Sequence, residues 1–208
     1  MRLSSRKRRK FLARNFRTLK NISSRALSLC YNKLMFSDPQ KNIAQFGIDY
    51  GMKVVDLGAG SGFYTIESAK LVGPSGRVYA VDVQQDLLNK IKTGGALAGL
   101  HNIEVIWGNI EKIGGTKLRE AIADRIILSN TLFQIAVADR DNLALEAKRL
   151  LKSGGKLLVV DWESASPLSP KTLIPRMLAE GIFQKVGFQI EKTFDAGDHH
   201  YGIIFKKP

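Results

Sequence analysis

The 208-residue chain contains a single cysteine, Cys30, and this scarcity limits its chemistry. One thiol cannot form an internal disulfide bond, and it cannot supply the clustered thiolates of a zinc or iron–sulfur site. The pair His199–His200 would need a third ligand, such as Asp195 or Asp198, and we interpret it as a turn or surface pair. We therefore expect no metal, and low cysteine usage favours a reducing, cytoplasmic compartment.

Long apolar runs are also absent. No uninterrupted stretch approaches the ~18 residues that a helix needs to span a bilayer, so we expect no transmembrane segment. The basic start of the chain is not followed by an apolar segment, so a secretory signal is not expected. Hydrophobic residues make up 44% of the chain, which is enough for one sizeable core. The length then predicts one domain with an appendage.

Acidic residues are missing from the first 37 positions. This stretch holds eleven Lys and Arg residues, five of them in or next to the run "RKRRK", whereas the first acid is Asp38. Subtracting these eleven from the 32 basic residues leaves 21, against 19 acids, so the rest of the chain carries only +2 of the total +13. We predict a basic, partly helical arm over residues 1–36 and a globular domain over residues 37–208.

The arm has several interpretations. Leu12, Phe16 and Leu19 recur near helical spacing, so a basic amphipathic helix in residues 1–35 could contact nucleic acid or an anionic membrane. A segment rich in Arg and Ser and free of acids is also typical of a mitochondrial transit peptide. The simplest alternative is a solvated arm that aids solubility or covers the active site. The sequence leaves these readings open, and it leaves open whether the protein is a monomer or a homodimer.

Short apolar runs alternate with longer amphipathic stretches after the arm. The predicted strands cover residues 53–57, 77–83, 103–107, 124–129, 156–161, 188–193 and 201–206. The predicted helices cover residues 64–72, 85–100, 139–152 and 172–186, and a shorter helix in residues 36–46 begins at Pro39 after an N-cap at Ser37 or Asp38. We expect the short helix to form part of a lid, or else to pack on the sheet.

The alternation predicts a doubly wound α/β fold in three layers, α/β/α. The last two strands have no helix between them and should be antiparallel neighbours, which gives a seven-stranded, mostly parallel sheet with one antiparallel strand. Ligands bind such sheets outside the carboxyl ends of the strands. The loop after the first strand is the prime position.

That loop lies in "VVDLGAGSGFYT", residues 54–65. The dinucleotide fingerprint G-x-G-x-x-G would need a third glycine where this chain has Phe63. The pattern is instead G-x-G-x-G, formed by Gly58, Gly60 and Gly62, with Asp56 two residues ahead. The second strand, "VYAVDV", ends in Asp82, whose carboxylate can accept hydrogen bonds from both hydroxyls of a ribose. Its alternative role is an N-cap of the helix that follows.

Several segments together resemble the class I S-adenosylmethionine (SAM) methyltransferases. Beside the glycine motif they are "NIEVIWGNIEKI", "ADRIILSNTLFQI" and "LALEAKRLLKSGGKLLVVDW", in the order and spacing of that family over residues 36–162. The whole domain is similar to small methyltransferases near the ubiquinone/menaquinone-biosynthesis type, and the closing "FDAGDHHYGIIFKK" is similar to bacterial members of that group. The resemblance implies a Rossmann-like fold, methyltransferase activity and SAM as cofactor.

The resemblance also implies which residues hold the cofactor. Asn109 would meet the adenine amino group, where the family often has Asp, and Ile110 would cover the ring. The full predicted set is Asp56, Gly58, Ala59, Gly60, Gly62, Asp82, Val83, Asn109, Ile110 and Ser129.

Methyl transfer from a sulfonium is an in-line displacement that depends mainly on alignment and on exclusion of water. A base is needed only where the acceptor must lose a proton, so the catalytic residues are unknown from sequence. Asn130 and Asp161 are the candidates, because each follows a late strand; Phe133, Trp162 and Glu163 lie beside them. Asp161 has the alternative of capping the strand end while Trp162 packs in the core.

The acceptor is less defined than the cofactor. The N-P-P-Y-like motif of many amino-group methyltransferases is absent from "SNTLF", and Cys30 lies outside every motif, which disfavours cysteine-dependent methylation of arsenic or RNA cytosine. The leading hypothesis is a small or lipid-like acceptor. The alternatives are an RNA or protein methyltransferase that docks through the arm, and a SAM-binding protein without catalysis. An NAD-dependent oxidoreductase is disfavoured by Phe63.

Overall fold

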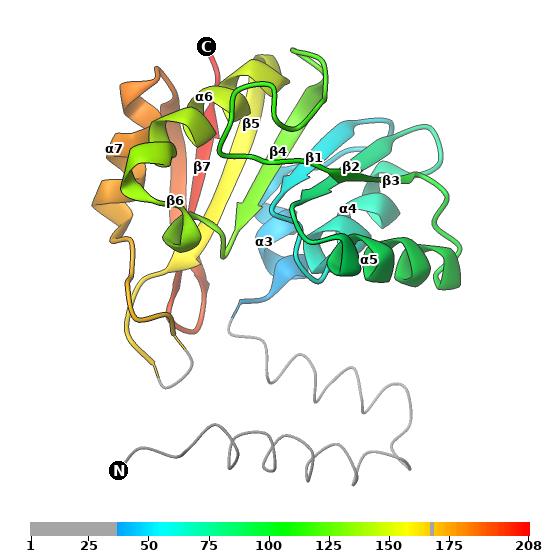
Figure 1. Cartoon of the computed structure of the whole chain (residues 1–208), viewed down its shortest axis with the longest axis horizontal. Coiled ribbons are helices and arrows are strands. Elements are labelled where there is room, and N and C mark those ends of the chain that lie inside the picture. Colours follow the sequence, from blue (N-terminus) through cyan, green and yellow to red (C-terminus); the bar gives the residue numbers. More distant parts are fainter. Residues whose placement is uncertain (1–36, 167–168) are drawn as a thin grey trace, which may run out of the picture. The chain divides into compact units, whose positions relative to one another are not determined.

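A computed structural model describes residues 37–166 and 169–208. The arm predicted over residues 1–36 lies outside the described residues and stays a prediction. The described chain forms one seven-stranded sheet in the order β3-β2-β1-β4-β5-β7-β6 (Figure 1). Its strands are β1 (Lys53–Leu57), β2 (Arg77–Asp82), β3 (Ile103–Trp107), β4 (Ala123–Ser129), β5 (Leu151–Trp162), β6 (Gln189–Gly197) and β7 (His200–Lys206).

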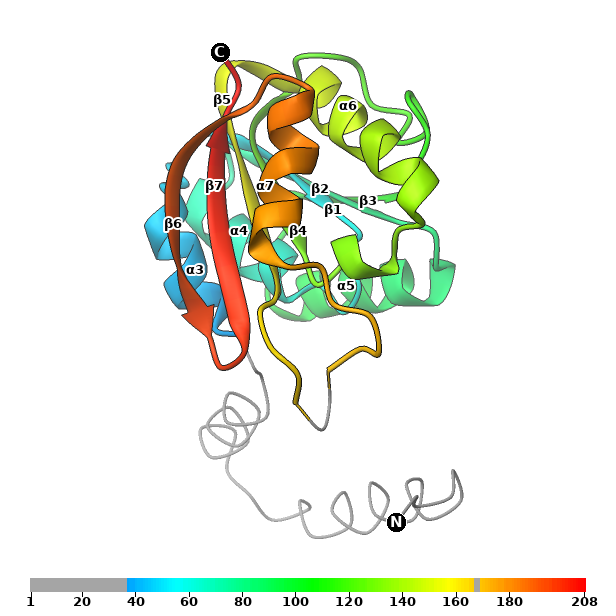
Figure 2. The same cartoon turned by 90° about the vertical axis from the view of Figure 1, so that its left-hand side faces the viewer.

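Five α-helices cover the two faces of the sheet (Figures 1 and 2). They are α3 (Pro39–Phe46), α4 (Phe63–Val72), α5 (Gln85–Leu97), α6 (Arg140–Leu150) and α7 (Arg176–Lys185), with two 3₁₀ turns, η2 (Leu132–Gln134) and η3 (Val137–Asp139), between β4 and α6. Buried residues of α3, α4 and α5 pack on one face and those of α6 and α7 on the other. The predicted three-layer, doubly wound architecture is confirmed.

Strand directions also agree with the prediction. β1, β2, β3, β4 and β5 pair in parallel, whereas β7 pairs antiparallel with both β5 and β6. One strand of seven therefore runs against the rest. Because β6 and β7 are joined by a tight hairpin, its tip lies at the same edge of the sheet as the carboxyl ends of the parallel strands (Figure 1).

Several element boundaries were predicted wrongly, among them the end of β6, which runs to Gly197 rather than to residue 193. β5 begins at Leu151 rather than near residue 156, because "KSGG" continues the strand instead of forming a separate turn. α7 begins at Arg176, with Pro175 at its N-cap in an extended conformation, so residues 172–175 are not helical. The short helix α3 was predicted correctly: Asp38 caps it by accepting hydrogen bonds from the backbone N–H groups of Gln40 and Lys41.

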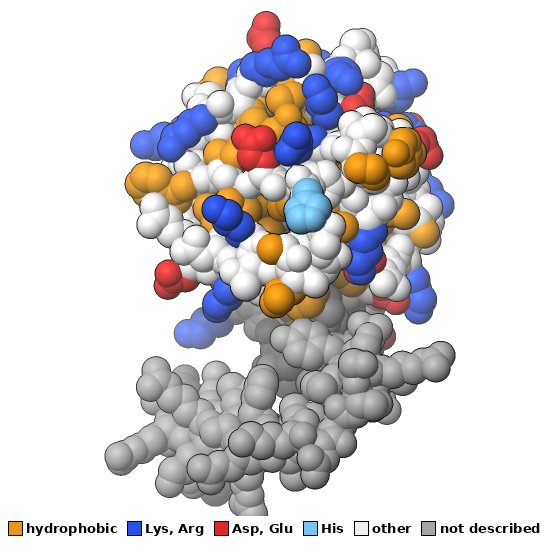
Figure 3. All heavy atoms as spheres, turned by 90° about the vertical axis from the view of Figure 1, so that its right-hand side faces the viewer, with side chains coloured by type: hydrophobic (Ala, Val, Ile, Leu, Met, Phe, Trp, Pro, Cys, Tyr) orange, Lys and Arg blue, Asp and Glu red, His pale blue; other side chains and the backbone are white. Residues whose placement is uncertain are grey.

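The surface of the folded unit is mixed in character. On the face that Figure 3 presents, basic, acidic and hydrophobic side chains are interspersed. Exposed hydrophobic residues include Leu97, Trp107 and Ile113. Among the described residues, none of the helices has the length and apolar character needed to cross a bilayer.

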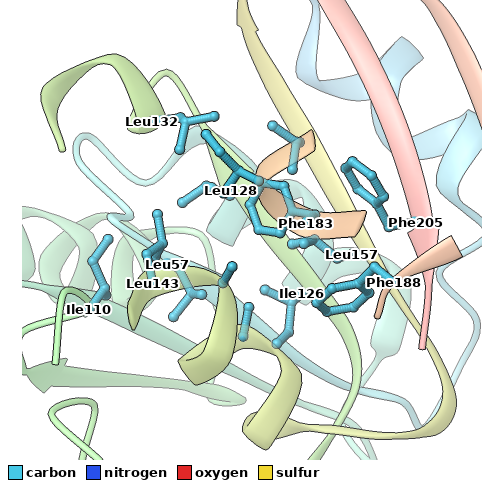
Figure 4. Packing of buried hydrophobic residues seen from close by; sticks show 14 of the residues in the cluster. Leu57, Ile110, Ile126, Leu128, Leu132, Leu143, Leu157, Phe183, Phe188 and Phe205 are labelled. Carbon is cyan, nitrogen blue, oxygen red and sulfur yellow. The ribbon is translucent and has the colours of Figure 1, made fainter. Parts of the chain in front are cut away.

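The larger hydrophobic core lies between the sheet and the pair α6–α7 (Figure 4). Leu57, Leu128 and Leu157 project from three neighbouring strands toward this layer, where Phe183 of α7 meets Phe205 of β7 with ring centroids 5.0 Å apart. The apolar runs that were predicted to be buried strands thus contribute side chains to the cores on both faces of the sheet. This packing holds the strand ends, and the loops that follow them, in fixed positions.

Candidate active site

The glycine loop joins β1 to α4, and its three glycines have left-handed φ angles of 71°, 53° and 81° at Gly58, Gly60 and Gly62. A Cβ atom at Gly58 would lie 2.7 Å from Oγ1 of Thr131, and one at Gly62 would lie 2.5 Å from Cγ1 of Ile91. At Gly60 the nearest atom would be 3.8 Å away. Glycine is thus required for packing at both ends of the loop, while the middle offers an open backbone surface.

Asp82 at the end of β2 ties this loop to the start of α5. One carboxylate oxygen accepts a hydrogen bond from the backbone N–H of Gly60 at 2.9 Å, and the other accepts from Gln84 at 2.8 Å. The N-cap alternative is wrong, because Gln84 is the N-cap of α5 and Asp82 accepts from the N–H of that residue in the turn before the helix. Each carboxylate oxygen keeps a second lone pair, so the predicted contact with ribose hydroxyls remains available.

The adenine side of the predicted site is formed by the residues after β2 and β3. Val83 is 57% exposed, whereas Ile110 is 6% exposed and joins the core. Trp107 fixes the backbone at Val83 by donating from its indole N–H to the Val83 carbonyl at 3.0 Å. Asn109 accepts a hydrogen bond from the Glu111 N–H at 2.8 Å through Oδ1, which leaves its amide N–H₂ for a ligand.

The segment after β3, residues 108–116, carries Asn109 and Ile110 and is called the adenine loop below. It is held in place by a residue that the sequence did not point to. Glu146 of α6 is fully buried and accepts hydrogen bonds from the N–H of Gly114, the hydroxyl of Thr116 and the guanidinium of Arg149. Burial acts to raise the pKa of Glu146, but the hydrogen bonds from Arg149 and Thr116 lower it overall. No sequence signal pointed to Glu146, because two of its partners, Gly114 and Thr116, lie 32 and 30 residues earlier in the chain.

Asp56 lies below the glycine loop and is almost fully buried. It accepts a hydrogen bond from the Thr65 hydroxyl at 2.6 Å. Burial raises the pKa of the Asp56 carboxyl to about 6, against the effect of the Thr65 hydrogen bond, and the nearby charge of Asp82 raises it further. A positive group bound beside Asp56 would favour its ionised form.

Ser129, the last residue of β4, contributes to a polar cluster under α3. The Tyr64 hydroxyl is hydrogen-bonded by the side chains of Asn42, at 2.9 Å, and of Ser129 and Ser37. Asn42 also donates to the carbonyl of Ala196 in β6. The cluster ties α3 to α4 and to the β6–β7 hairpin, so the packing alternative for α3 holds, and its role as a lid stays a prediction.

The loop after β4 contacts the glycine loop. Asn130 has a left-handed φ of 52°, and its N–H donates to the Val160 carbonyl of β5 at 2.8 Å. The next residue, Thr131, is the one whose side chain would collide with a Cβ at Gly58. Asn130, a predicted catalytic candidate, therefore immediately precedes the residue that packs against the glycine loop.

Asp161, the second catalytic candidate, has no exposed surface. Its carboxylate accepts hydrogen bonds from the N–H groups of Trp162 at 2.8 Å and Phe133 at 3.3 Å, and it thereby fixes η2. Burial raises the pKa of Asp161 to about 6, opposed by these backbone hydrogen bonds. The geometry supports the alternative weighed from the sequence, in which Asp161 caps the strand end and Trp162, 8% exposed, packs in the core.

A groove of about 800 Å³ lies between α3, the segment after β5 and the β6–β7 hairpin. Its walls include Glu163, Arg176, His199, His200 and Tyr201. The Tyr201 hydroxyl is buried and has no hydrogen-bond partner among the described residues. An unpaired buried hydroxyl is unusual in a folded protein, and the Tyr201 side chain packs in the core between the sheet and the pair α6–α7. No group of three potential metal ligands gathers within residues 37–166 and 169–208.

Residues 48–192 match the family described as a methyltransferase domain. The chain belongs to this family. It is 31% identical over 145 residues to the ubiquinone/menaquinone biosynthesis C-methyltransferase UbiE of Pasteurella multocida, a match that covers 68% of this chain and 51% of UbiE. The chain thus spans about half the length of the curated relatives it matches.

Other similarities fall in the same class. The chain is 35% identical over 115 residues to an arsenite methyltransferase of Aquipseudomonas alcaligenes, which covers 53% of this chain and 33% of that protein. Among solved structures, a SAM-dependent methyltransferase from Aquifex aeolicus matches with a TM-score of 0.76 and 27% identity, over 85% of this chain and 93% of that one. The predicted methyltransferase family, fold and SAM cofactor are confirmed.

One further structural match limits what the fold alone can establish. The [4+2]-cyclase SpnF superposes with a TM-score of 0.68 at 15% identity, over 81% of this chain and 79% of SpnF. This likeness concerns the fold only. The individual contacts predicted for the cofactor remain predictions, although the residues that should make them lie together at one edge of the sheet.

Proposed function

We propose that this protein transfers the methyl group of SAM to a small-molecule acceptor bound in the groove beside the β6–β7 hairpin. The observation that carries the proposal is the position of the Asn130–Thr131 loop. Thr131 packs against Gly58 of the glycine loop, and Asn130 is hydrogen-bonded to His200 of the groove wall. A single short loop therefore separates the predicted cofactor position from the groove.

The residues present fit SAM as the cofactor. The open backbone at Gly60 can receive the ligand, Asp82 retains lone pairs for the ribose, and the exposed side chain of Val83 offers apolar surface for a flat ring. When bound, SAM supplies a methyl group on a positively charged sulfur. The chain's own contribution is alignment of the acceptor with that methyl group and exclusion of water.

The acceptor atom that we favour is carbon. The similarity to UbiE, which is named a C-methyltransferase, supports this choice. Arsenite is disfavoured in spite of the second relative, because a soft arsenic centre calls for thiolate ligands and the chain has only Cys30. Polar and charged groups line the groove, so the part of the acceptor held there should carry hydrogen-bonding groups.

Calorimetry with SAM and with NAD tests the cofactor. We expect binding of SAM and none of NAD, and no binding of SAM at millimolar concentration would contradict the proposal. Gly60→Ala tests the loop itself, since the position has room for a Cβ atom but its left-handed φ of 53° strains any side chain there. It should weaken SAM binding, and the thermal unfolding transition, measured in parallel, separates that effect from a loss of stability.

Transfer of labelled methyl from SAM into a cell extract tests the acceptor. The extract is separated into RNA, protein, lipid and small-molecule fractions, and label should appear in the small molecules. Label in RNA or protein would support instead a methyltransferase that docks through residues 1–36. No label in any fraction, with SAM still bound, would favour a protein that binds SAM without methyl transfer.

A further inference from the structure

His200 is a buried histidine in a groove wall, and its ring is held on three sides. The side chain is 3% exposed and lies against Trp162, with ring centroids 4.2 Å apart. Its Nδ1 is 2.7 Å from the carbonyl oxygen of Asp198, and its Nε2 is 3.0 Å from Oδ1 of Asn130. Both neighbours of the ring nitrogens are thus oxygen atoms.

A neutral imidazole cannot donate to two oxygens. It carries one N–H, and the other nitrogen is an acceptor. The Asp198 carbonyl can only accept, so the N–H must be on Nδ1. Nε2 then needs a donor, and Asn130 can provide one if its carboxamide turns by 180°, which exchanges Oδ1 and the N–H₂ group without moving other atoms.

The charge on the ring decides between this arrangement and its alternative, an imidazolium that donates from both nitrogens. Burial lowers the pKa of His200 and so favours the neutral ring, and the nearby His199 acts in the same direction. The Asp198 carbonyl and carboxylate act in the opposite direction but are the smaller influence. Further along the groove lie the charged groups Asp38, Lys41, Glu163, Arg176 and Asp195.

We propose that His200 is a positioning residue that turns the Asn130 carboxamide so that its carbonyl oxygen faces the methyl acceptor. In this arrangement Nε2 of His200 accepts from the Asn130 N–H₂ group. The Asn130 oxygen, pointing away from His200, has no partner among the described residues and can accept from a hydroxyl or amine of the acceptor. The left-handed backbone at Asn130, braced by the bond to Val160, fixes where that oxygen lies.

This inference rests on the proposed function for the identity of the ligand, but its first test does not depend on activity. Long-range ¹H–¹⁵N correlation spectra of the full chain, labelled in histidine, report which ring nitrogen carries the proton. The chain has three histidines, so His101→Gln and His199→Gln variants assign the His200 signals. A protonated Nδ1 with a bare Nε2 at pH 7.5 supports the proposal, and an Nε2–H tautomer or a doubly protonated ring overturns it.

Two variants separate the hydrogen bond from the packing. His200→Phe keeps an aromatic ring against Trp162 but removes the acceptor, whereas His200→Gln retains an amide oxygen that can accept from Asn130. The side-chain N–H₂ signals of Asn130, assigned by their loss in Asn130→Ala, should shift in the Phe variant and stay near their original position in the Gln variant. Equal shifts in both variants would contradict a specific acceptor at Nε2.

The same variants extend the test to methyl transfer. We expect His200→Phe to reduce labelling of the small-molecule fraction about 10-fold and His200→Gln to restore most of it, with SAM affinity unchanged in both. A loss of SAM affinity equal to the loss of labelling would overturn the positioning role. If the wild-type protein labels nothing, the proposed function fails, while the tautomer measurement still decides whether His200 orients Asn130.

Discussion

At the scale of single residues, Asp82 connects the glycine loop to the predicted ribose position. Replacing Asp82 by Ala should weaken SAM binding about 10- to 100-fold, because hydrogen bonds to a neutral ribose and the bond that fixes Gly60 are both lost. Calorimetry measures the effect. Asp86→Ala removes the same charge from an exposed position in α5 and should leave the affinity unchanged. An unaltered affinity in the Asp82 variant would remove this residue from the site.

Asp56 should make the folded state less stable as pH rises. Burial raises its pKa in the folded protein to about 6, whereas in the unfolded chain it titrates near 3.8. Between these values the folded state binds more protons than the unfolded state, so the free energy of unfolding falls as pH increases from about 4 to 6. Above that range the folded state carries an unfavourable buried charge.

Asp56→Asn should remove that dependence. At pH 7 we expect the variant to be more stable by up to about 3 kcal/mol, and the difference from wild type should vanish below pH 4. Urea denaturation at several pH values measures it, and taking the difference cancels the other titrating groups. A variant less stable than wild type at pH 7 would show that the carboxylate of Asp56 is compensated in the folded protein.

Tyr201 offers a second test at this scale. Its buried hydroxyl lacks a partner, and such a group costs about 1–3 kcal/mol when it leaves water. Tyr201→Phe should therefore raise the free energy of unfolding by about 1 kcal/mol. A lower stability than wild type would mean that the hydroxyl has a partner in the folded protein.

At the scale of elements, the adenine loop depends on α6. Glu146→Ala should destabilise the fold by about 3 kcal/mol, because Arg149 would lose its buried partner, and should weaken SAM binding because Gly114 and Thr116 are released. Asp141→Ala is the matched control, since it removes an acid that pairs with Lys185 at the exposed surface of the same helix. Its effect should stay within about 1 kcal/mol.

The order and type of the elements could be predicted because most strands read as short apolar runs, several of which end at glycine or an acid, as at Gly58, Asp82 and Gly108. The glycine loop and Asp82 were also readable, since their chemistry depends on local spacing. Glu146 and the His200–Asn130 pair were not, because they are contacts between residues 30 to 70 positions apart. The start of α7 was misplaced because a proline fits both the first turn of a helix and the residue before it.

At the scale of the whole molecule, charge divides the chain into two parts. The surface of the folded unit mixes both signs (Figure 3), and residues 37–208 carry a net charge of only +2. The excess resides in residues 1–36, whereas every predicted cofactor residue lies between positions 56 and 129. Binding to polyanions and binding of SAM should therefore be separable functions.

Deletion of residues 1–35 tests that separation. Within the described residues, the hydrophobic clusters are built from positions 43–205, so we expect the shortened chain to keep its unfolding transition and its SAM affinity. Removing eleven positive charges should abolish retention on a polyanionic column at physiological salt, since each phosphate or sulfate contact adds to the salt dependence of binding.

Comparing RNA with anionic vesicles then identifies the partner: loss of RNA binding alone favours nucleic acid, and loss of vesicle binding alone favours a membrane surface. If the shortened and full chains are retained equally, the arm does not bind polyanions and only aids solubility.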